Sequence, residues 1–117
     1  RSSDLLSDSD WDAIHTGMRM VVENTKEFDG FPIEAAGKTG TAQEDLKRPN
    51  HALFVGYAPY DNPEISIATR IANGYTSHNA AEVSKKILAY YFKVEDADSL
   101  LNGQAENINA TSNGVND

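Results

Sequence analysis

The chain has 117 residues, 39% of them hydrophobic, which is enough apolar material for one small domain and no more. It contains no cysteine, which excludes disulfides, thiolate metal sites and a cysteine nucleophile. The net charge of −8 is concentrated at the two ends, and the segment from Trp11 to Lys93 is nearly balanced, so we expect no basic surface for nucleic acid or a membrane.

The start of the chain carries no recognisable leader. It begins at Arg1, and its first ten residues, RSSDLLSDSD, lack the apolar core of a signal peptide or membrane anchor. We therefore expect the chain to be a piece of a longer protein.

The first element is predicted to be a helix. Its apolar residues recur three and four positions apart, at Trp11, Ile14, Met18, Val21 and Val22. This spacing predicts one buried stripe, and Ser9 with Asp12 resembles a capping box at the start. Gly17 inside a helix costs about 1 kcal/mol relative to alanine, so we expect a neighbouring element to approach closely there.

Three extended segments follow the helix. They span residues 33–42, 51–58 (HALFVGYA) and 64–72 (EISIATRIA). The last alternates isoleucines with small or polar residues, which is typical of a strand, and places Arg70 on its polar face. The polar links between the segments are short enough for hairpins and too short for parallel crossovers. The sequence therefore predicts an antiparallel sheet.

A second helix is predicted after Asn73-Gly74. Asn79 is the expected N-cap, with Glu82 at the third helical position. The expected buried stripe is Ala80, Val83, Ile87, Tyr90 and Tyr91. The order of elements predicts an α+β fold in which a three-stranded antiparallel sheet is flanked by an N-terminal and a C-terminal helix.

The last 24 residues, 94–117, are predicted to form a tail. They carry five acidic residues and no basic one, with many Asn, Ser and Gly residues and few apolar ones. So little apolar area does not offset the cost of ordering a chain, so we expect this tail to be disordered and the folded part to span residues 9–93.

The stretch AGKTGTA, residues 36–42, is the strongest candidate in the sequence for a binding or catalytic site. A phosphate-binding loop requires glycine five residues before Gly37, where the chain has Pro32. An edge strand of small residues, with Lys38 discouraging aggregation, is one interpretation. The other is a binding strand, in which Lys38 and two hydroxyls on one face, Thr39 and Thr41, bind a carboxylate, and the two glycines let another backbone or a ligand approach closely. An edge strand can also pair with an extended peptide.

The surrounding sequence favours the binding strand. The Lys-Thr-Gly triplet with the following Thr41, then HALFVGYAP and NPEISIATRI, resembles the third motif and the next two strands of class B penicillin-binding proteins, the monofunctional D,D-transpeptidases. The helix before the triplet and the final helix are also similar, so the resemblance covers residues 9–93 and implies the C-terminal part of a transpeptidase domain.

The resemblance implies roles for four residues. Lys38 would supply positive charge near a catalytic serine, Thr39 and Thr41 would bind the substrate carboxylate, and Gly40 would leave room for its backbone. The Thr41 backbone N–H would be one oxyanion-hole donor. The implied ligands are a peptidoglycan stem peptide ending in D-Ala-D-Ala and β-lactams, without a cofactor, at the extracytoplasmic face of the bacterial membrane.

The nucleophilic motif of that family is absent from these 117 residues. No serine has a lysine three positions later, as Ser-x-x-Lys requires, so we expect the chain alone to be inactive and to need the remainder of the transpeptidase domain. The triplet Ser77-His78-Asn79 matches Ser-x-Asn but follows Lys-Thr-Gly, so we assign it to helix capping. The three histidines are too dispersed for a metal site.

Two non-enzymatic alternatives remain at this point. One is the β-lactam-sensing domain of a receptor, in which the same strand binds a ligand without turnover. The other is a non-catalytic interaction module with the same fold. A Ser-x-x-Lys and then a Ser-x-Asn sequence upstream would favour an enzyme or a sensor over the module.

Overall fold

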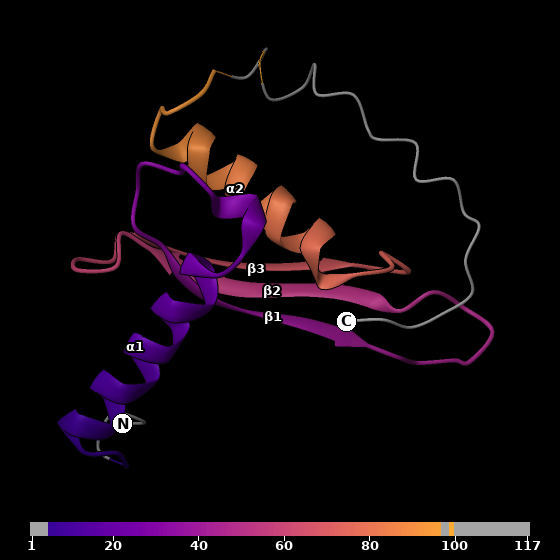
Figure 1. Ribbon diagram of the computed structural model, residues 1–117, viewed down its shortest axis with the longest axis horizontal. Helices are drawn as coiled ribbons and strands as arrows, with labels where there is room; N and C mark the ends of the chain where they lie inside the picture. The colour runs from indigo at the N-terminus through magenta and orange to yellow at the C-terminus, as the bar shows by residue number, and fades with distance from the viewer. Residues whose placement is uncertain (1–4, 97–98, 100–117) are drawn as a thin grey trace.

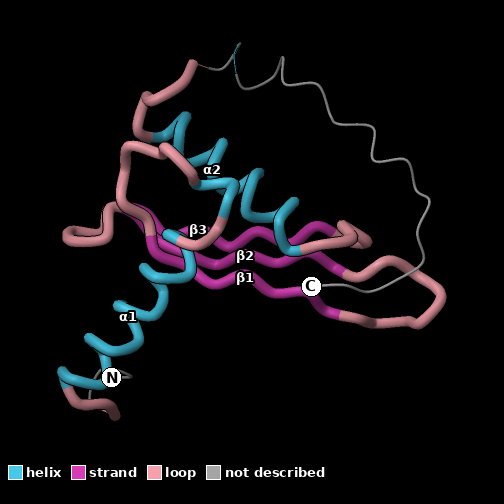
Figure 2. The backbone as a smooth tube through the Cα atoms, in the orientation of Figure 1, coloured by secondary structure: helices cyan, strands magenta, loops and turns pink. Residues whose placement is uncertain are grey.

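A computed structural model describes residues 5–96 and 99, and in it two helices accompany one three-stranded sheet (Figure 1). The elements are α1 (Asp8–Glu23), a short 3₁₀ turn η2 (Lys26–Phe28), β1 (Ala36–Ala42), β2 (His51–Ala58), β3 (Ile65–Ile71) and α2 (Ser77–Tyr91). The strand order is β1-β2-β3, and both neighbouring pairs are antiparallel. The predicted α+β architecture is confirmed, and Figure 2 shows the loops that join the strands at both ends of the sheet.

The first strand begins three residues later than expected. Before Ala36 the backbone bonds elsewhere: the Glu34 carbonyl accepts from the Tyr60 N–H at 2.7 Å, and the Ala35 carbonyl accepts from Arg19 Nη1 at 2.9 Å. These bonds tie the segment to α1 and to the β2–β3 loop instead of the β2 ladder. The bounds of β2 agree with the prediction, and those of β3 differ by one residue at each end.

The register of the sheet defines two faces. Thr39 lies opposite Phe54 and Thr41 opposite Ala52, whereas Lys38 lies opposite Val55. Residues directly opposite one another in antiparallel strands share a face, and successive residues alternate between faces. Phe54 and Ala52 are fully buried and belong to the core with Leu88 of α2, so one face of the sheet lies under α2.

The Phe54 ring rests directly on two glycines of the sheet. A Cβ atom at Gly37 would lie 2.5 Å from Phe54 Cζ, and one at Gly56 would lie 2.8 Å from Phe54 Cε1. On its other side the ring stacks on Phe28 of η2, with centroids 5.6 Å apart. The remaining core residues are mostly small: Val22, Ala35, Ala52, Ala58, Ala80, Ala81 and Leu88.

The buried face of α2 differs from the predicted one. Ala80 is buried as expected, but the other four predicted residues are exposed by 39% to 61%; they are Val83, Ile87, Tyr90 and Tyr91. The face against the sheet consists of Ser77, Ala80, Ala81, Ser84, Leu88 and Ala89. The prediction was wrong because small side chains let the helix approach the strands closely, and the larger residues occupy the outer side.

Both predicted helix starts are displaced. Ser7 caps α1, and its side chain accepts from the Asp10 N–H while the Asp10 carboxylate accepts from Ser7, so the capping box uses this pair and not Ser9 with Asp12. These hydrogen bonds, first from the Ser7 side chain and then from its backbone, lower the pKa of Asp10. Thr76 caps α2, since it has the extended conformation of an N-cap, whereas Asn79 lies inside the first turn.

Helix α1 is less buried than its stripe predicts. It starts away from the sheet and approaches the strands toward its C-terminal end (Figure 1). Val22 is its only buried residue, and Ile14 is exposed. The His15 ring contacts Tyr57, which alternation places on the face opposite Phe54, with centroids 5.7 Å apart. A Cβ at Gly17 would meet no atom within 4 Å, so the expected close approach is wrong among the described residues.

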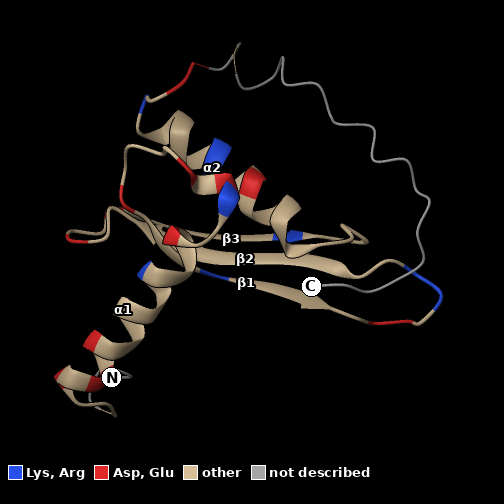
Figure 3. Cartoon of the chain, viewed as in Figure 1, with Lys and Arg blue, Asp and Glu red and all other residues tan. Residues whose placement is uncertain are grey.

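Charged residues are spread over the elements (Figure 3). Lys and Arg residues occur in α1, β1, β3, α2 and the β1–β2 loop, and acidic residues gather in the first turns of α1. Among the described residues, no helix is long and apolar enough to cross a membrane. Beyond Asp96, with the exception of Ser99, the predicted tail lies outside the described residues.

We expect Gly17→Ala to raise the free energy of unfolding by about 1 kcal/mol, because alanine is the better helix former and the added methyl group meets nothing. Urea unfolding of the 117-residue chain, followed by circular dichroism, measures the change. An unchanged or lower midpoint would mean that another segment occupies the space at Gly17.

We expect Gly37→Ala to lower the free energy of unfolding by about 1–3 kcal/mol, because its methyl group overlaps the Phe54 ring and the Val55 carbonyl oxygen. Gly40→Ala is the matched control in the same strand, since its Cβ would lie 3.5 Å from the nearest atom, an ordinary contact. Equal stability of the two variants would contradict this account of the core.

Candidate functional site

The stretch AGKTGTA forms the whole of β1, and β1 is an edge strand. It pairs with β2 on one side, and its other side is the edge of the sheet among the described residues. Edge strands leave every second N–H and C=O group free to bond an added strand. The sequence therefore places the Lys-Thr-Gly triplet on a strand that can accept an extended peptide.

The side chains of β1 divide between the two faces. Thr39 and Thr41 share one face, as predicted. This face lies under α2, and both residues are half-buried. Lys38 points to the opposite face and is exposed, and its Nζ donates to the Thr39 carbonyl oxygen at 2.7 Å. The structure therefore brings the two hydroxyls together and places the ammonium group on the other side of the strand.

The Lys38 contact indicates which backbone groups are open. A carbonyl that an exposed lysine can reach lies on the free edge of the strand, so the Thr39 C=O points there. In an antiparallel strand the N–H and C=O of one residue point to the same side, and residues two apart repeat that direction. By this periodicity the Thr41 N–H also faces the free edge.

The surroundings of Gly37 and Gly40, the two glycines of the stretch, differ. At Gly37 the close approach comes from the chain itself, since a Cβ there would lie 2.5 Å from Phe54 Cζ and 2.7 Å from the Val55 carbonyl oxygen, so no space is left for a ligand on that side. A Cβ at Gly40 would be tolerated, at 3.5 Å from Leu53 Cβ, so the fold of this chain does not require glycine there. Gly40 lies on the Lys38 face, and its need for space stays a prediction.

The end of β1 contacts the start of α2. The Ser77 backbone N–H donates to Thr41 Oγ1 at 3.3 Å. Sequence reasoning missed this bond, because the two residues are 36 positions apart and no local pattern signals the contact. The Asn79 side chain donates to the Gly74 carbonyl at 2.8 Å and so braces the turn before the helix.

The three histidines occupy separate surroundings. His51 Nε2 lies 2.6 Å from a Glu44 carboxylate oxygen, and its Nδ1 accepts from the Asn73 N–H at 3.0 Å, which assigns the ring proton to Nε2. His78 Nδ1 lies 3.0 Å from a Glu27 carboxylate oxygen. In the described part of the chain, no three His, Cys, Asp or Glu side chains are grouped as metal ligands.

Tyr57 is the titratable group most affected by burial near β1. Desolvation first, and the neighbouring Tyr60 second, raise the pKa of its phenol above the ordinary value of 10.0. The phenol therefore stays protonated at neutral pH. It contributes aromatic contacts with His15 and Tyr60 and carries no charge on the Lys38 face.

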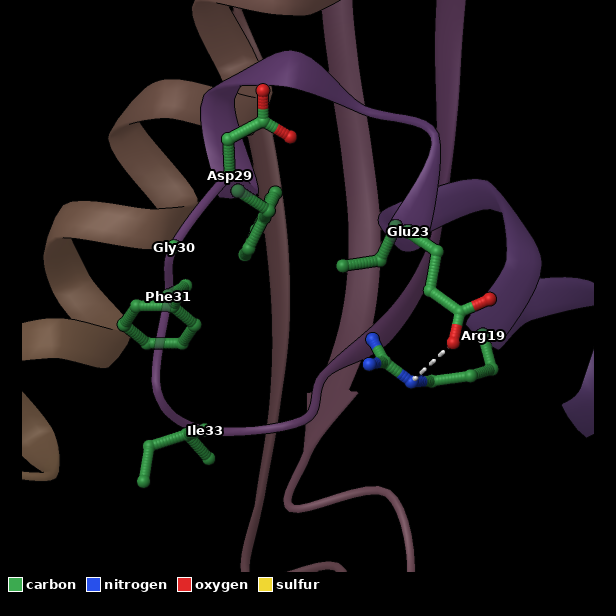
Figure 4. A pocket seen from close by; sticks show the side chains of 8 residues that line it. Arg19, Glu23, Asp29, Gly30, Phe31 and Ile33 are labelled. Atoms are coloured by element: carbon green, nitrogen blue, oxygen red, sulfur yellow. Dashed lines mark ion pairs between the residues drawn. The ribbon is translucent and has the colours of Figure 1, made fainter.

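A pocket of about 240 Å³ lies away from β1, between α1, η2 and the loop that follows (Figure 4). Its main charged group is Arg19, whose Nε lies 3.4 Å from Glu23 and whose Nη1 donates to the Ala35 carbonyl. The guanidinium is therefore already engaged in holding α1 to the start of β1. This pocket is lined by none of the four candidate site residues, Lys38, Thr39, Gly40 and Thr41.

Comparison with known proteins now identifies the family. Residues 4–89 match the family model described as penicillin binding protein transpeptidase domain, which is most of the chain. The chain therefore belongs to the penicillin-binding protein transpeptidase family, and it contains part of that domain. The predicted resemblance is confirmed.

The relatives are class B penicillin-binding proteins. The peptidoglycan D,D-transpeptidase MrdA of Haemophilus influenzae is 35% identical over 101 residues, which cover 69% of this chain and 16% of the relative. Penicillin-binding protein 2B of Streptococcus pneumoniae has a solved structure with a TM-score of 0.67 and 27% identity, covering 77% of this chain and 16% of that chain. The structure of PBP2 of Pseudomonas aeruginosa in complex with WCK 5153 superimposes with a TM-score of 0.66 and 34% sequence identity. The match covers 73% of this chain and 20% of that chain. The chain thus spans about a sixth of the curated relative.

One structural neighbour carries a β-lactam. Penicillin-binding protein A of Mycobacterium tuberculosis, solved as a ceftriaxone acyl-enzyme complex, superimposes with a TM-score of 0.59 over 64% of this chain and 19% of that chain. At 22% identity this likeness shows a shared fold. That protein forms a covalent adduct with the drug.

Proposed function

We propose that this chain supplies the substrate-binding strand of a peptidoglycan D,D-transpeptidase. Its ligand is the carboxylate end of a stem peptide that terminates in D-Ala-D-Ala, or the carboxylate of a β-lactam that imitates it. The observation that carries the proposal is that AGKTGTA forms an edge strand with Thr39 and Thr41 on one face. Two hydroxyl donors beside an open strand edge suit a carboxylate at the end of an extended peptide.

In this proposal the hydroxyls and the ammonium group have separate tasks. Thr39 and Thr41 donate hydrogen bonds to the ligand carboxylate. Lys38 lies on the other face and supplies positive charge there, where it would favour deprotonation of a serine provided by the rest of the domain. Its Nζ bonds the Thr39 carbonyl at 2.7 Å, and a peptide that pairs with the β1 edge would compete for that carbonyl.

The Thr41 backbone N–H is proposed as one donor of the oxyanion hole. The alternation of backbone groups along β1 supports this role, because it places the Thr41 N–H on the same free edge as the Thr39 carbonyl. Loss of one such donor costs on the order of 3 kcal/mol in the transition state. Gly40 lies between the two threonines in sequence. Because it has no side chain, it leaves room for the substrate backbone beside the strand.

The complete reaction needs residues outside this chain. In the whole protein a serine would attack the carbonyl carbon of the penultimate D-alanine and form an acyl-enzyme, and terminal D-alanine would leave with the proton. An amine of a neighbouring strand would then attack the ester and release the serine. None of the nine serines in this chain has lysine three residues later, so the remainder of the domain is the required partner, at the extracytoplasmic face of the membrane.

An enzyme is favoured over the sensing receptor and over the interaction module. The relative with 35% identity is named a D,D-transpeptidase, and no comparison reported above names a receptor. Residues 9–93 would form the C-terminal portion of the transpeptidase domain, and residues 94–117 would form a separate tail.

The binding proposal predicts that the 117-residue chain binds Nα,Nε-diacetyl-Lys-D-Ala-D-Ala through its carboxylate. In a ¹⁵N NMR titration, we expect shifts in the β1 amides with the free acid and at least about fivefold weaker binding with the C-terminal amide, because a charged hydrogen bond is lost.

Two variants locate the site. Thr41→Val should weaken binding by a similar factor, and Gly40→Ala should weaken it without unfolding the chain. Half-buried Lys85 on α2 is a control position away from β1, and Lys85→Gln should bind like the unaltered chain. Equal affinity for acid and amide would refute the proposed carboxylate site.

We also expect the chain to form no covalent adduct with penicillin G or ceftriaxone, because it contains no Ser-x-x-Lys nucleophile. Intact-protein mass spectrometry after incubation should show an unchanged mass, with a complete class B transpeptidase as the positive control. A stoichiometric adduct that survives denaturation would disprove this expectation.

A further inference from the structure

The start of α2 lies against the hydroxyl of Thr41. The Ser77 N–H donates to Thr41 Oγ1 at 3.3 Å, and Ser77, the first residue of the helix, is buried. Thr41 itself is half-buried at the α2 face of β1. The contact therefore joins the proposed carboxylate-binding strand to an element that is far away in sequence and has no assigned part in binding.

This contact restricts the direction in which the Thr41 hydroxyl can donate. A hydroxyl that accepts an N–H bond keeps its own proton for another acceptor, which must lie away from that N–H. Accepting a bond also polarises the O–H group and makes it a stronger donor. A carboxylate offers only acceptors, so it suits a hydroxyl held in this way.

We propose that Ser77 is a positioning residue, whose backbone N–H orients the Thr41 hydroxyl as a donor to the ligand carboxylate. This inference rests on the proposed function of β1 and extends it to the N-terminus of α2. The helix has 15 residues, and its positive end adds favourable electrostatics toward an anion bound beside Thr41.

The turn before α2 holds Ser77 in place. The Thr76 hydroxyl caps the helix by accepting from the His78 N–H, and the Asn79 side chain donates to the Gly74 carbonyl at 2.8 Å. Gly74 is buried, and a Cβ there would lie 2.9 Å from Ala52 Cβ and from Ile71 Cβ. The turn is thus packed directly on the sheet.

The same turn contains two residues in the left-handed region. Asn73 has φ of 53° and Tyr75 has φ of 68°, a conformation that is rare for a bulky residue such as tyrosine. Their N–H groups donate to residues at the start of β2. The Asn73 N–H donates to His51 Nδ1 and the Tyr75 N–H to the Asn50 carbonyl, both at 3.0 Å. These bonds offset the uncommon backbone geometry and fix where α2 begins.

A pair of substitutions separates the N–H of Ser77 from its side chain. Ser77→Pro removes the N–H and the hydroxyl, whereas Ser77→Ala removes only the hydroxyl. Proline is well tolerated at the first position of a helix. The preceding Thr76 already has φ of −132° and ψ of 149°, the conformation that a residue before proline prefers.

Binding of Nα,Nε-diacetyl-Lys-D-Ala-D-Ala to the full chain is measured by ¹⁵N NMR for each variant, with circular dichroism as the test of folding. We expect Ser77→Ala to bind within twofold of the unaltered chain and Ser77→Pro to bind about fivefold more weakly, the effect of one hydrogen bond. In a Thr41→Val background, Ser77→Pro should cause no further loss, because the hydroxyl that it orients is gone.

Other outcomes overturn the inference. Equal binding by the proline and alanine variants, or an additive loss in the double variant, would show that Ser77 does not act through Thr41. A loss with Thr41→Val but none with Ser77→Pro refutes the inference and leaves the proposed function intact. No binding by the unaltered chain refutes both.

A second measurement does not depend on the folding of the proline variant. In the unaltered chain the Ser77 amide resonance should shift together with that of Thr41 during the titration, and in Thr41→Val the Ser77 shift should disappear. A Ser77 resonance that does not move in the unaltered chain would also overturn the inference.

Discussion

The fold depends on the way that Phe54 lies flat on the sheet. Its ring occupies the space above Gly37 and Gly56, where any Cβ would come within 3 Å of it, and Phe28 covers its other side. A one-residue slip of β1 would bring a side chain under the ring and move every residue to the opposite face. This contact therefore sets the register that puts Thr39 and Thr41 on the α2 face.

The same packing determines where α2 lies. Because Phe54 fills the centre of the sheet, the helix presents mostly small residues to the strands: three alanines, two serines and Leu88. The Ser84 hydroxyl donates to the Ala80 carbonyl and to the Thr69 hydroxyl, each at 2.7 Å. Close approach of α2 brings its first residue to Thr41. The core and the proposed binding strand thus share one set of constraints, which explains why a glycine within a binding motif has a structural role.

Sequence reasoning predicted the strands well and the helices less well. The bounds of β2 and the shared face of Thr39 and Thr41 followed from local alternation, which depends only on neighbouring residues. For α2 the large apolar residues gave a clear helical stripe, yet packing selected the smaller residues on the other side. Periodicity reports where apolar residues are, and it does not report how closely a helix approaches a sheet.

The site was predictable only in part for the same reason. The Lys-Thr-Gly motif identified the family, and the family model confirmed it. The motif did not reveal that the Phe54 ring, 17 residues later in the chain, fills the space above Gly37, or that the Ser77 N–H donates to Thr41. Both are tertiary contacts between distant residues. The pairing of Ser7 with Asp10 was within reach of sequence reasoning, because the same spacing occurs two residues before the pair that we chose.

The central claim is that a carboxylate-terminated peptide lies along β1 with its end at the two threonines. Intermolecular nuclear Overhauser effects test this most directly, with ¹³C-labelled chain and unlabelled Nα,Nε-diacetyl-Lys-D-Ala-D-Ala. The account predicts contacts from the terminal D-alanine methyl protons to the methyl groups of Thr39 and Thr41. Contacts confined to the outer face of α2 or to the Arg19 pocket, with none to β1, would contradict it.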